Sequence, residues 1–334
     1  MMAHASGFLR APTFMRGFET KIFDPNDPAT GSNGAEVLDA SVVRRAQQWQ
    51  MYLAGQAHQV GAPQLFSAAL APGAPLSATG WQLTRDREGE LIPLVPPAVS
   101  GAWDGDGGRH CPAYVRGFDP HTEQWTERIY YAGASDHAWG PYSIGYVEWD
   151  GSAWRPHDAP VLQSQAEWEH GSVFEPNVLY HDGKWLMWYV AGSHRENYLV
   201  HGCAQSRDGR EWEARTLFAP AEMRMFDFCV RRRGDGFEAV FSRIAESAQP
   251  EQAGLWWCHA AQPGTRLADW SDPVQIMNCE DKGWHSGPFK PSLAFEEQAS
   301  RRAFIFFDGT YDTGAGGPFP YAFTLGCLEI DLPE

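Results

Sequence analysis

Phe174-Glu-Pro-Asn-Val178 contains one of five related four-residue phrases in this 334-residue chain. Four of the five phrases begin with an ionisable side chain, and every phrase ends with an apolar one. The phrases are Asp39-Ala-Ser-Val42, Cys111-Pro-Ala-Tyr114, Glu175-Pro-Asn-Val178, Asp227-Phe-Cys-Val230 and Lys290-Pro-Ser-Leu293. A phrase that recurs every 50 to 75 residues indicates a radial repeat, in which equivalent positions meet around one axis. Three carboxylates are therefore expected to converge.

The rest of each unit supports this register. An aromatic, strand-like run follows each phrase, as in Trp185-Leu-Met-Trp-Tyr-Val-Ala-Gly192, and a run of small and apolar residues comes next, as in His201-Gly-Cys-Ala204. Each unit then closes on a turn with a tryptophan, and Trp154, Trp212 and Trp270 recur at 58-residue intervals. Short strands joined by glycine-rich turns form one antiparallel blade. We interpret these tryptophans, with Trp81, as packing residues.

Five such units predict an all-β, single-domain, five-bladed β-propeller. The blades are expected at about residues 36–100, 101–170, 171–222, 223–283 and 284–332. The fifth unit ends close to the end of the chain and lacks an outermost strand. N-terminal residues 5–20 are expected to supply that strand and close the ring. Ring closure removes the exposed edges of an open sheet.

Composition limits the partners. The formal charge is −16, which opposes binding to nucleic acid or to anionic membranes. No apolar stretch has the roughly 20 residues that a membrane helix needs, and the first residues do not resemble a signal peptide. The six cysteines occur singly, which favours reduced thiols and a cytoplasmic protein. The oligomeric state stays open.

The first positions of the phrases are the candidate catalytic residues. In a propeller, the innermost strand of each blade lines the channel, so Asp39, Glu175 and Asp227 are expected near the axis with Cys111 and Lys290. Carboxylates confined together in a partly dry cavity cannot all ionise at their usual pKa values. One of them should hold a proton near neutrality, which general acid catalysis requires.

These phrases, the aromatic strands and the turn Ser206-Arg-Asp-Gly-Arg-Glu-Trp212 are similar to five-bladed glycoside hydrolases of families 43, 32 and 62. The resemblance covers roughly residues 36 to 330. It implies that Asp39 is the general base of an inverting enzyme or the nucleophile of a retaining one. It further implies that Glu175 tunes the acid and that Asp227 protonates the leaving oxygen. An arabinofuranoside, xyloside, fructoside or small oligosaccharide is the substrate class that it implies.

The sequence departs from the family pattern at three points, one of which is that the first phrase is Asp39-Ala40 and lacks the common Pro. The family usually has Asp in the third blade and Glu in the fourth, whereas Glu175 and Asp227 have the reverse order. Lys290 adds an ammonium group among the carboxylates, which makes phosphorylated or carboxylated substrates worth considering. A biosynthetic enzyme with non-hydrolytic chemistry and a non-catalytic carbohydrate-binding propeller are the alternatives to a hydrolase. In the simplest alternative, the acids only accept hydrogen bonds from neighbouring turns.

Other polar and aromatic residues lie on segments next to the expected channel mouth and are candidates for binding a sugar ring. They are Trp103, Arg109, His110, His194, Arg195, Arg243, Trp284, His285 and Lys290. No paired-cysteine or His-x-x-x-His spacing supports a transition-metal site, and no cofactor is expected. A structural calcium or sodium ion in the channel stays open, because carboxylates and carbonyls crowd there. No phosphate-binding loop and no Gly-x-Ser-x-Gly elbow is found.

Overall fold

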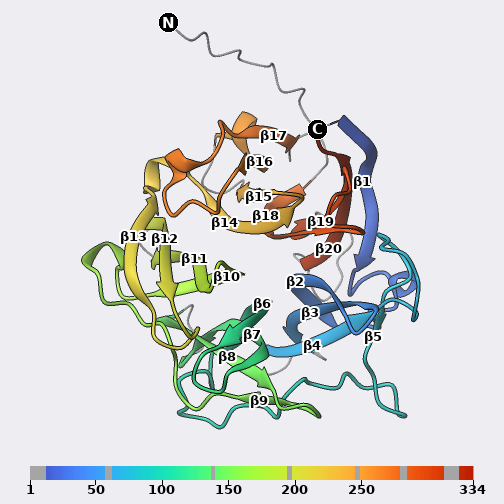
Figure 1. The fold of residues 1–334 in the computed structure, drawn as a ribbon. Helices are drawn as coiled ribbons and strands as arrows, with labels where there is room; N and C mark the ends of the chain where they lie inside the picture. Colours follow the sequence, from blue (N-terminus) through green and yellow to red (C-terminus); the bar gives the residue numbers. More distant parts are fainter. Residues whose placement is uncertain are drawn as a thin grey trace, which may run out of the picture.

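Five four-stranded antiparallel sheets stand around a central channel, so the prediction of a five-bladed propeller is confirmed (Figure 1). The structure is a computed structural model that describes residues 13–56, 62–136, 140–193, 198–244, 249–278, 284–311 and 323–333. Five 3-10 helices of one turn each lie on its connections: η1 (Pro28–Thr30), η2 (Glu167–Glu169), η3 (Ala221–Met223), η4 (Pro250–Gln252) and η5 (Leu267–Asp269).

In each of the first four blades, the strands run outward from the channel in chain order. The first blade contains β2 (Glu36–Arg45), β3 (Gln48–Gln56), β4 (Gln64–Ala69) and β5 (Gln82–Leu83). The second contains β6 (Gly108–Asp119), β7 (Gln124–Ala134), β8 (Tyr142–Trp149) and β9 (Trp154–Pro156). The third contains β10 (Val173–His181), β11 (Lys184–Ser193), β12 (Tyr198–Ser206) and β13 (Glu213–Ala219). The fourth contains β14 (Phe226–Arg233), β15 (Gly236–Arg243), β16 (Gly254–Ala260) and β17 (Val274–Asn278).

The fifth blade joins the two ends of the chain. It contains β18 (Trp284–Phe295), β19 (Arg302–Tyr311) and β20 (Phe323–Asp331), and the N-terminal strand β1 (Thr13–Phe23) is its outermost strand. Strand β1 pairs with β20 from Thr13 opposite Asp331 to Phe23 opposite Leu325. The predicted closure of the ring by an N-terminal strand is therefore confirmed. The strand ends at Phe23, beyond the expected residues 5–20, and residues 5–12 of that range lie outside the described part of the chain.

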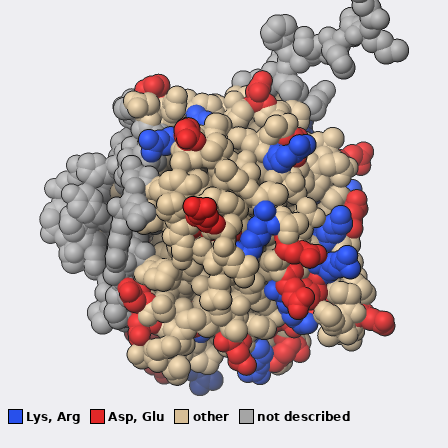
Figure 2. Space-filling view, turned by 90° about the vertical axis from the view of Figure 1, so that its left-hand side faces the viewer, with Lys and Arg blue, Asp and Glu red and all other residues tan. Residues whose placement is uncertain are grey.

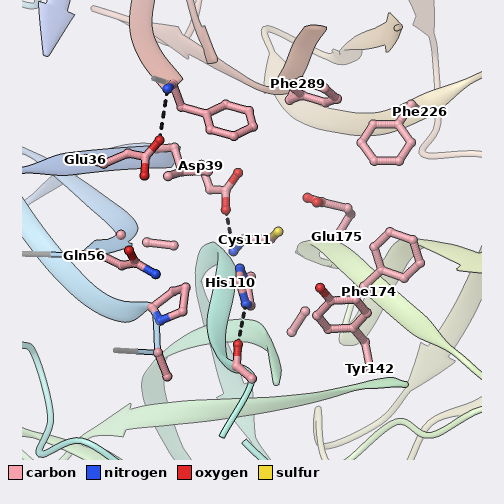
Figure 3. Close-up of a pocket in the computed structure, with 18 of the residues that line it drawn as sticks. Glu36, Asp39, Gln56, His110, Cys111, Tyr142, Phe174, Glu175, Phe226 and Phe289 are labelled. Atoms are coloured by element: carbon pink, nitrogen blue, oxygen red, sulfur yellow. Dashed lines mark hydrogen bonds between the residues drawn. The ribbon is translucent and has the colours of Figure 1, made fainter. Parts of the chain in front are cut away.

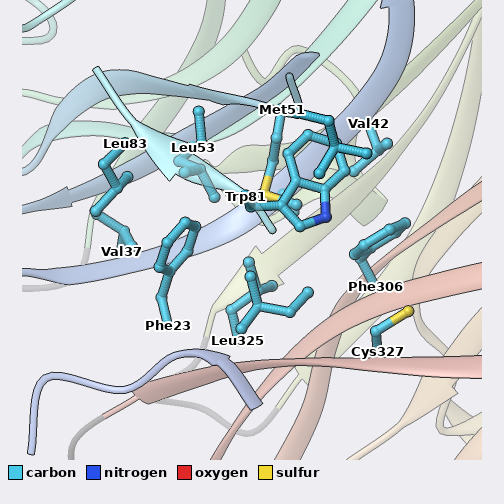
Figure 4. Packing of buried hydrophobic residues seen from close by; sticks show 14 of the residues in the cluster. Phe23, Val37, Val42, Met51, Leu53, Trp81, Leu83, Phe306, Leu325 and Cys327 are labelled. Atoms are coloured by element: carbon cyan, nitrogen blue, oxygen red, sulfur yellow. The ribbon is translucent and has the colours of Figure 1, made fainter. Parts of the chain in front are cut away.

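The closing tryptophans pack between blades, as expected. Trp81 is 6% exposed and meets the Phe306 ring of the fifth blade edge-on at 5.8 Å. Phe23 from β1 and Leu325 from β20 belong to the same apolar cluster (Figure 4). This cluster joins the first blade to the last, so hydrophobic burial reinforces the backbone pairing that closes the ring.

The cysteines, the helices and the surface charges also bear on the expectations from composition. The described cysteines are all buried and unpaired. None of the helices in the described part of the chain is long and apolar enough to cross a membrane. Figure 2 shows that basic side chains on that face are interspersed with acidic ones and form no continuous basic surface there.

The first residue of every repeated phrase has a left-handed backbone. The φ angles are +59° at Asp39, +55° at Cys111, +51° at Glu175, +59° at Asp227 and +44° at Lys290. The pairing between the innermost strand and its neighbour shifts register at the same place in all five blades. A left-handed residue at a register shift is the signature of a β-bulge, which re-aims a side chain. The sequence repeat therefore marks a repeated backbone distortion.

Side chains of one blade accept hydrogen bonds from the innermost strand of the next. Such a strand is the edge of its sheet, so the N–H groups that face away from the sheet need other acceptors. The acceptors are Ser41 Oγ for Tyr114 N at 3.0 Å, Asn177 Oδ1 for Val230 N at 3.0 Å, Cys229 Sγ for Leu293 N at 3.4 Å, and Ser292 Oγ for Val42 N at 3.0 Å. Four of the five blade junctions are tied in this way. At the remaining junction the matching residue is Ala113, whose side chain has no acceptor atom.

We expect Ser41→Ala to destabilise the protein by about 1–3 kcal/mol, because Tyr114 N–H then lacks its acceptor in a partly buried position. Urea-induced unfolding measures the change. Ser100→Ala, in an exposed turn, is the matched control and should stay within about 0.5 kcal/mol. Equal effects of the two substitutions would show that the bond between blades contributes nothing.

Candidate active site

A cavity of about 660 Å³ lies where the innermost strands begin, and residues of all five blades line it. Its size falls within the range of small-molecule sites, roughly 300–1,000 Å³. Asp39, Cys111 and Glu175 line the cavity, and Figure 3 shows them facing one another from three different strands. One oxygen of Asp39, one oxygen of Glu175 and the sulfur of Cys111 all lie within 4.8 Å of one another. The bulges thus bring residues from three blades together.

Asp227 and Lys290 lie behind this group. Asp227 is 2% exposed and Lys290 is 6% exposed, and neither is among the residues that line the cavity. The Lys290 ammonium lies 3.3 Å from Glu175 Oε2 and donates to the Pro176 carbonyl at 2.8 Å. Burial alone lowers the pKa of Lys290, but nearby acidic groups, first Glu175, outweigh burial and raise it. Lys290 is therefore charged and engaged within the protein.

Burial raises the pKa of two neighbouring carboxyl groups, Glu175 and Asp227. Burial, together with the charge of Asp227, raises the pKa of Glu175 well above its usual range, although Lys290 opposes the shift. Burial also raises the pKa of Asp227, and the Lys290 ammonium opposes that shift. Both groups therefore favour the protonated form more than an exposed carboxyl group does.

Two of the channel aspartates also hold the blades together. Asp39 Oδ2 accepts Cys111 N at 3.0 Å, and Asp227 Oδ2 accepts Lys290 N at 2.7 Å. Each bond joins the bulge of one blade to the bulge of a neighbouring blade. The simplest alternative, that these acids accept hydrogen bonds from neighbouring segments, thus describes part of what they do.

Asp308 is a site residue that the sequence analysis missed. It is 0% exposed, and its Oδ2 accepts Asp39 N at 2.5 Å. Burial and the charge of Asp39 raise its pKa well above the usual range. Asp308 is paired with Phe289, and the matching positions of the other blades hold Ala54, Ala132, Val190 and Ser242. The sequence did contain a signal for Asp308: it is an acidic residue at a position where the other four repeats have uncharged residues.

Aromatic rings form an arc around part of the cavity. Phe174, Phe226 and Phe289 each directly precede a bulge residue, and Tyr142 and Phe323 extend the arc at its two ends. Successive ring centroids are 5.3 Å apart for Tyr142 and Phe174, 6.4 Å for Phe174 and Phe226, 5.8 Å for Phe226 and Phe289, and 5.8 Å for Phe289 and Phe323. All five rings line the cavity.

Of the predicted binding residues, His110 lines the cavity and donates from Nε2 to the Gly107 carbonyl at 2.8 Å. Arg109 is 3% exposed and forms an ion pair with Asp104 at 2.7 Å. Trp103 stacks on Tyr131 at 5.4 Å. Neither Arg109 nor Trp103 lines the cavity, so the structure places both in packing positions.

Arg243 stacks over Trp256 at 4.3 Å and is likewise absent from the lining of the cavity. The neighbouring residue, Ile244, lines it instead. His194 and Arg195 lie outside the described residues. Trp284 and His285 belong to the backbone of β18, and their side chains also lie outside the described part.

Among the described residues, Asp39, Cys111 and Glu175 form the one group of donors close enough to share a metal ion. A thiol with two carboxylates suits a softer ion such as zinc better than calcium or sodium, which prefer oxygen donors alone. The Lys290 ammonium, 3.3 Å from Glu175 Oε2, already occupies the place of a cation beside this group. Lys290 therefore balances part of the negative charge of this group, and a calcium or sodium ion stays an expectation from the sequence.

No protein-family model and no curated protein matches the sequence. Solved structures match the fold. A thermostable family-43 glycoside hydrolase aligns with a TM-score of 0.58 at 14% identity over 89% of this chain and 89% of the other. Zg3597, a family 117 glycoside hydrolase of the marine bacterium Zobellia galactanivorans, aligns with 0.63 at 12% identity over 97% and 90%. An α-L-arabinofuranosidase from Lactobacillus brevis aligns with 0.61 at 11% identity over 88% and 90%. The chain thus shares the propeller fold of these proteins over most of its length.

We expect Asp308→Asn to stabilise the protein increasingly as the pH rises. An unfolded aspartate ionises near pH 3.9, whereas the raised pKa keeps Asp308 protonated in the folded protein. Above the unfolded pKa, the folded state therefore binds more protons, and its stability falls with pH until the folded pKa is passed. The amide introduced by the substitution does not titrate and can still accept Asp39 N–H. The difference in Tm between variant and wild type, measured from pH 5 to pH 8, should grow in favour of the variant; a constant difference would contradict the raised pKa.

Proposed function

We propose that this protein is a glycoside hydrolase in which Asp39 and Glu175 are the reacting carboxyl groups. The observation that carries this proposal is the meeting of these two groups within 4.8 Å on a cavity wall, with the pKa of Glu175 raised well above its usual range. Glycoside hydrolysis needs one ionised carboxylate and one protonated carboxyl beside the scissile bond. The fold shared with glycoside hydrolases of low sequence identity supports the same activity.

The roles of Glu175 and Asp227 are exchanged relative to those implied by the family resemblance. Glu175 lines the cavity, its pKa is raised well above the usual range, and its side chain is one methylene longer than that of Asp227. Asp227 is 2% exposed and does not line the cavity. We therefore assign Glu175 as the general acid and Asp227 as the residue whose charge helps to raise the pKa of Glu175. The reversed order of Asp and Glu in the sequence is consistent with this exchange.

The short separation favours a double displacement. Retaining enzymes place their carboxyl groups about 5–5.5 Å apart, whereas inverting enzymes leave about 6.5–9.5 Å for a water molecule. Asp39 forms a bond to the anomeric carbon as the glycosidic C–O bond breaks, and Glu175 gives its proton to the leaving oxygen. Glu175 then takes a proton from water, the water oxygen bonds to the anomeric carbon, and Asp39 is released.

We propose a short glycoside as the substrate, of the arabinofuranoside, xyloside or fructoside type. A cavity of about 660 Å³ matches a small molecule better than a long polysaccharide chain. The arabinofuranosidases among the structures with the same fold support the first of these types. A panel of p-nitrophenyl pentosides and hexosides is therefore the starting point for assays.

We expect Asp39→Asn to lower kcat/KM by about 10³-fold or more on every active aryl glycoside, because the nucleophile is lost. The fold should survive, since Asn tolerates a positive φ and can still accept Cys111 N–H. Glu175→Gln should impair a substrate with a poor leaving group severely and a 2,4-dinitrophenyl glycoside much less, because the latter needs no proton. Circular dichroism checks folding, and unchanged turnover in both variants would falsify the assignment.

We expect the first-formed sugar to keep the anomeric configuration of the substrate. Proton NMR of the product during the first minutes of the reaction distinguishes retention from inversion. Inversion would require Asp39 and Glu175 to move apart and admit a water molecule between them and the sugar. In that case the loss of activity in Asp39→Asn would mark Asp39 as a general base, and Glu175 would stay the general acid.

A non-catalytic carbohydrate-binding propeller is the second candidate. It is favoured by the hydrogen bonds that Asp39 and Asp227 accept from neighbouring blades, since these bonds give the two acids a structural role that needs no catalysis. Glycan affinity that is unaltered by Asp39→Asn and Glu175→Gln, with no product formed, would select this function.

A further inference from the structure

The cavity has two unlike sides. The third, fourth and fifth blades contribute Phe174, Phe226, Phe289 and Phe323, joined by Ile244. The first and second blades contribute the carboxylates Glu36, Asp106 and Asp136. A ligand that fills the cavity therefore meets aromatic rings on one side and negative charge on the other.

No described lysine or arginine lines this cavity. Lys290 is buried against Glu175 and the Pro176 carbonyl, and Arg109 is held by Asp104. A phosphorylated or carboxylated ligand would find no described cation to pair with and several carboxylates to repel it. The anionic substrates that Lys290 suggested in the sequence are therefore disfavoured by its position.

Glu36 is placed to receive a cation beside an aromatic ring. Its Oε1 accepts the backbone N–H of Phe323 at 3.0 Å, so the carboxylate is fixed against the end of the aromatic arc. Burial raises the pKa of Glu36 above its usual range, which means that its negative charge is poorly compensated by the protein and by water. A ligand cation would supply that compensation.

A second observation at the base of the cavity points the same way. Glu175 is 9% exposed and lines the cavity, and its Oε2 takes part in no hydrogen bond even though the Lys290 ammonium is 3.3 Å away. A buried carboxyl oxygen without a hydrogen-bond partner is costly unless a ligand donates to it. The base of the cavity thus offers an unused acceptor to a ligand that carries hydrogen-bond donors.

We propose that this cavity binds a glycoside that carries an ammonium or substituted ammonium group next to an apolar face, with Glu36 facing the cation. Carboxylates attract the charge, and the faces of aromatic rings such as Phe323 and Phe289 attract cations further by their quadrupole. The apolar face lies against the arc of phenylalanines. This inference rests on the proposed function for the identity of the sugar-cleaving groups, but cation recognition can be measured without catalysis.

Binding of three small probes of similar shape tests the proposal: phenethylammonium, phenethyl alcohol and 3-phenylpropionate. Isothermal titration calorimetry at low ionic strength should show the cation binding at least 10-fold more tightly than the alcohol and the anion most weakly. Equal affinities, or preference for the anion, would overturn the proposal.

Glu36→Gln is the diagnostic variant, because Gln can still accept Phe323 N–H and removes only the charge. The ratio of cation to alcohol affinity should fall about 10-fold. Glu88→Gln, at an exposed turn position, is the matched control and should leave the ratio unchanged. A ratio that stays the same in the Glu36 variant would also overturn the proposal.

The two proposals can fail separately. Hydrolysis of neutral aryl glycosides without any preference for the cationic probe would refute the recognition of a cation and keep the hydrolase. Selective binding of the cation without hydrolysis of any glycoside in the panel would keep the recognition and refute the hydrolase.

Discussion

Each blade of this propeller presents an edge strand to the channel, and the backbone N–H groups of that edge must find acceptors. Strands β2, β6, β10, β14 and β18 are at the end of their sheets and have no strand on the channel side. Polar side chains of neighbouring blades fill this need at four junctions, and Asp39, Asp227 and Asp308 do so nearer the mouth. The hub is therefore a ring of hydrogen bonds between blades, and unsatisfied buried donors would otherwise cost about 1–3 kcal/mol each.

The same positions build the candidate active site. A left-handed bulge at each phrase is unfavourable for residues other than glycine, yet all five blades keep it with a carboxyl, thiol or ammonium side chain. The distortion lets these side chains meet at the channel, where burial raises the pKa values of Cys111, Glu175 and Asp227. Asp39 joins two blades through its bond from Cys111 N–H, and in the proposed function it is also the nucleophile. Substitution by Asn separates these two roles better than substitution by Ala.

Much of this was predictable because a propeller repeats in sequence what it repeats in space. The five phrases predicted the blades, the closing strand and the meeting of Asp39, Cys111, Glu175, Asp227 and Lys290. Asp308 escaped notice because its contact with Asp39 spans 269 residues and depends on the pairing register of the last blade. The aromatic arc escaped for a similar reason, since Tyr142 and Phe323 come from other strands than the repeated phrase.

The sequence by itself determined the number of blades and the residues that face the axis, because strand periodicity and the spacing of repeats are local properties of the chain. Only the tertiary structure decided which of these residues reach the cavity and which carboxyl groups have raised pKa values. Those properties depend on burial and on distances between blades. Lys290 illustrates the difference: its position in the repeat was evident, but only its ion pair with Glu175 and its hydrogen bond to Pro176 show that it balances charge inside the protein.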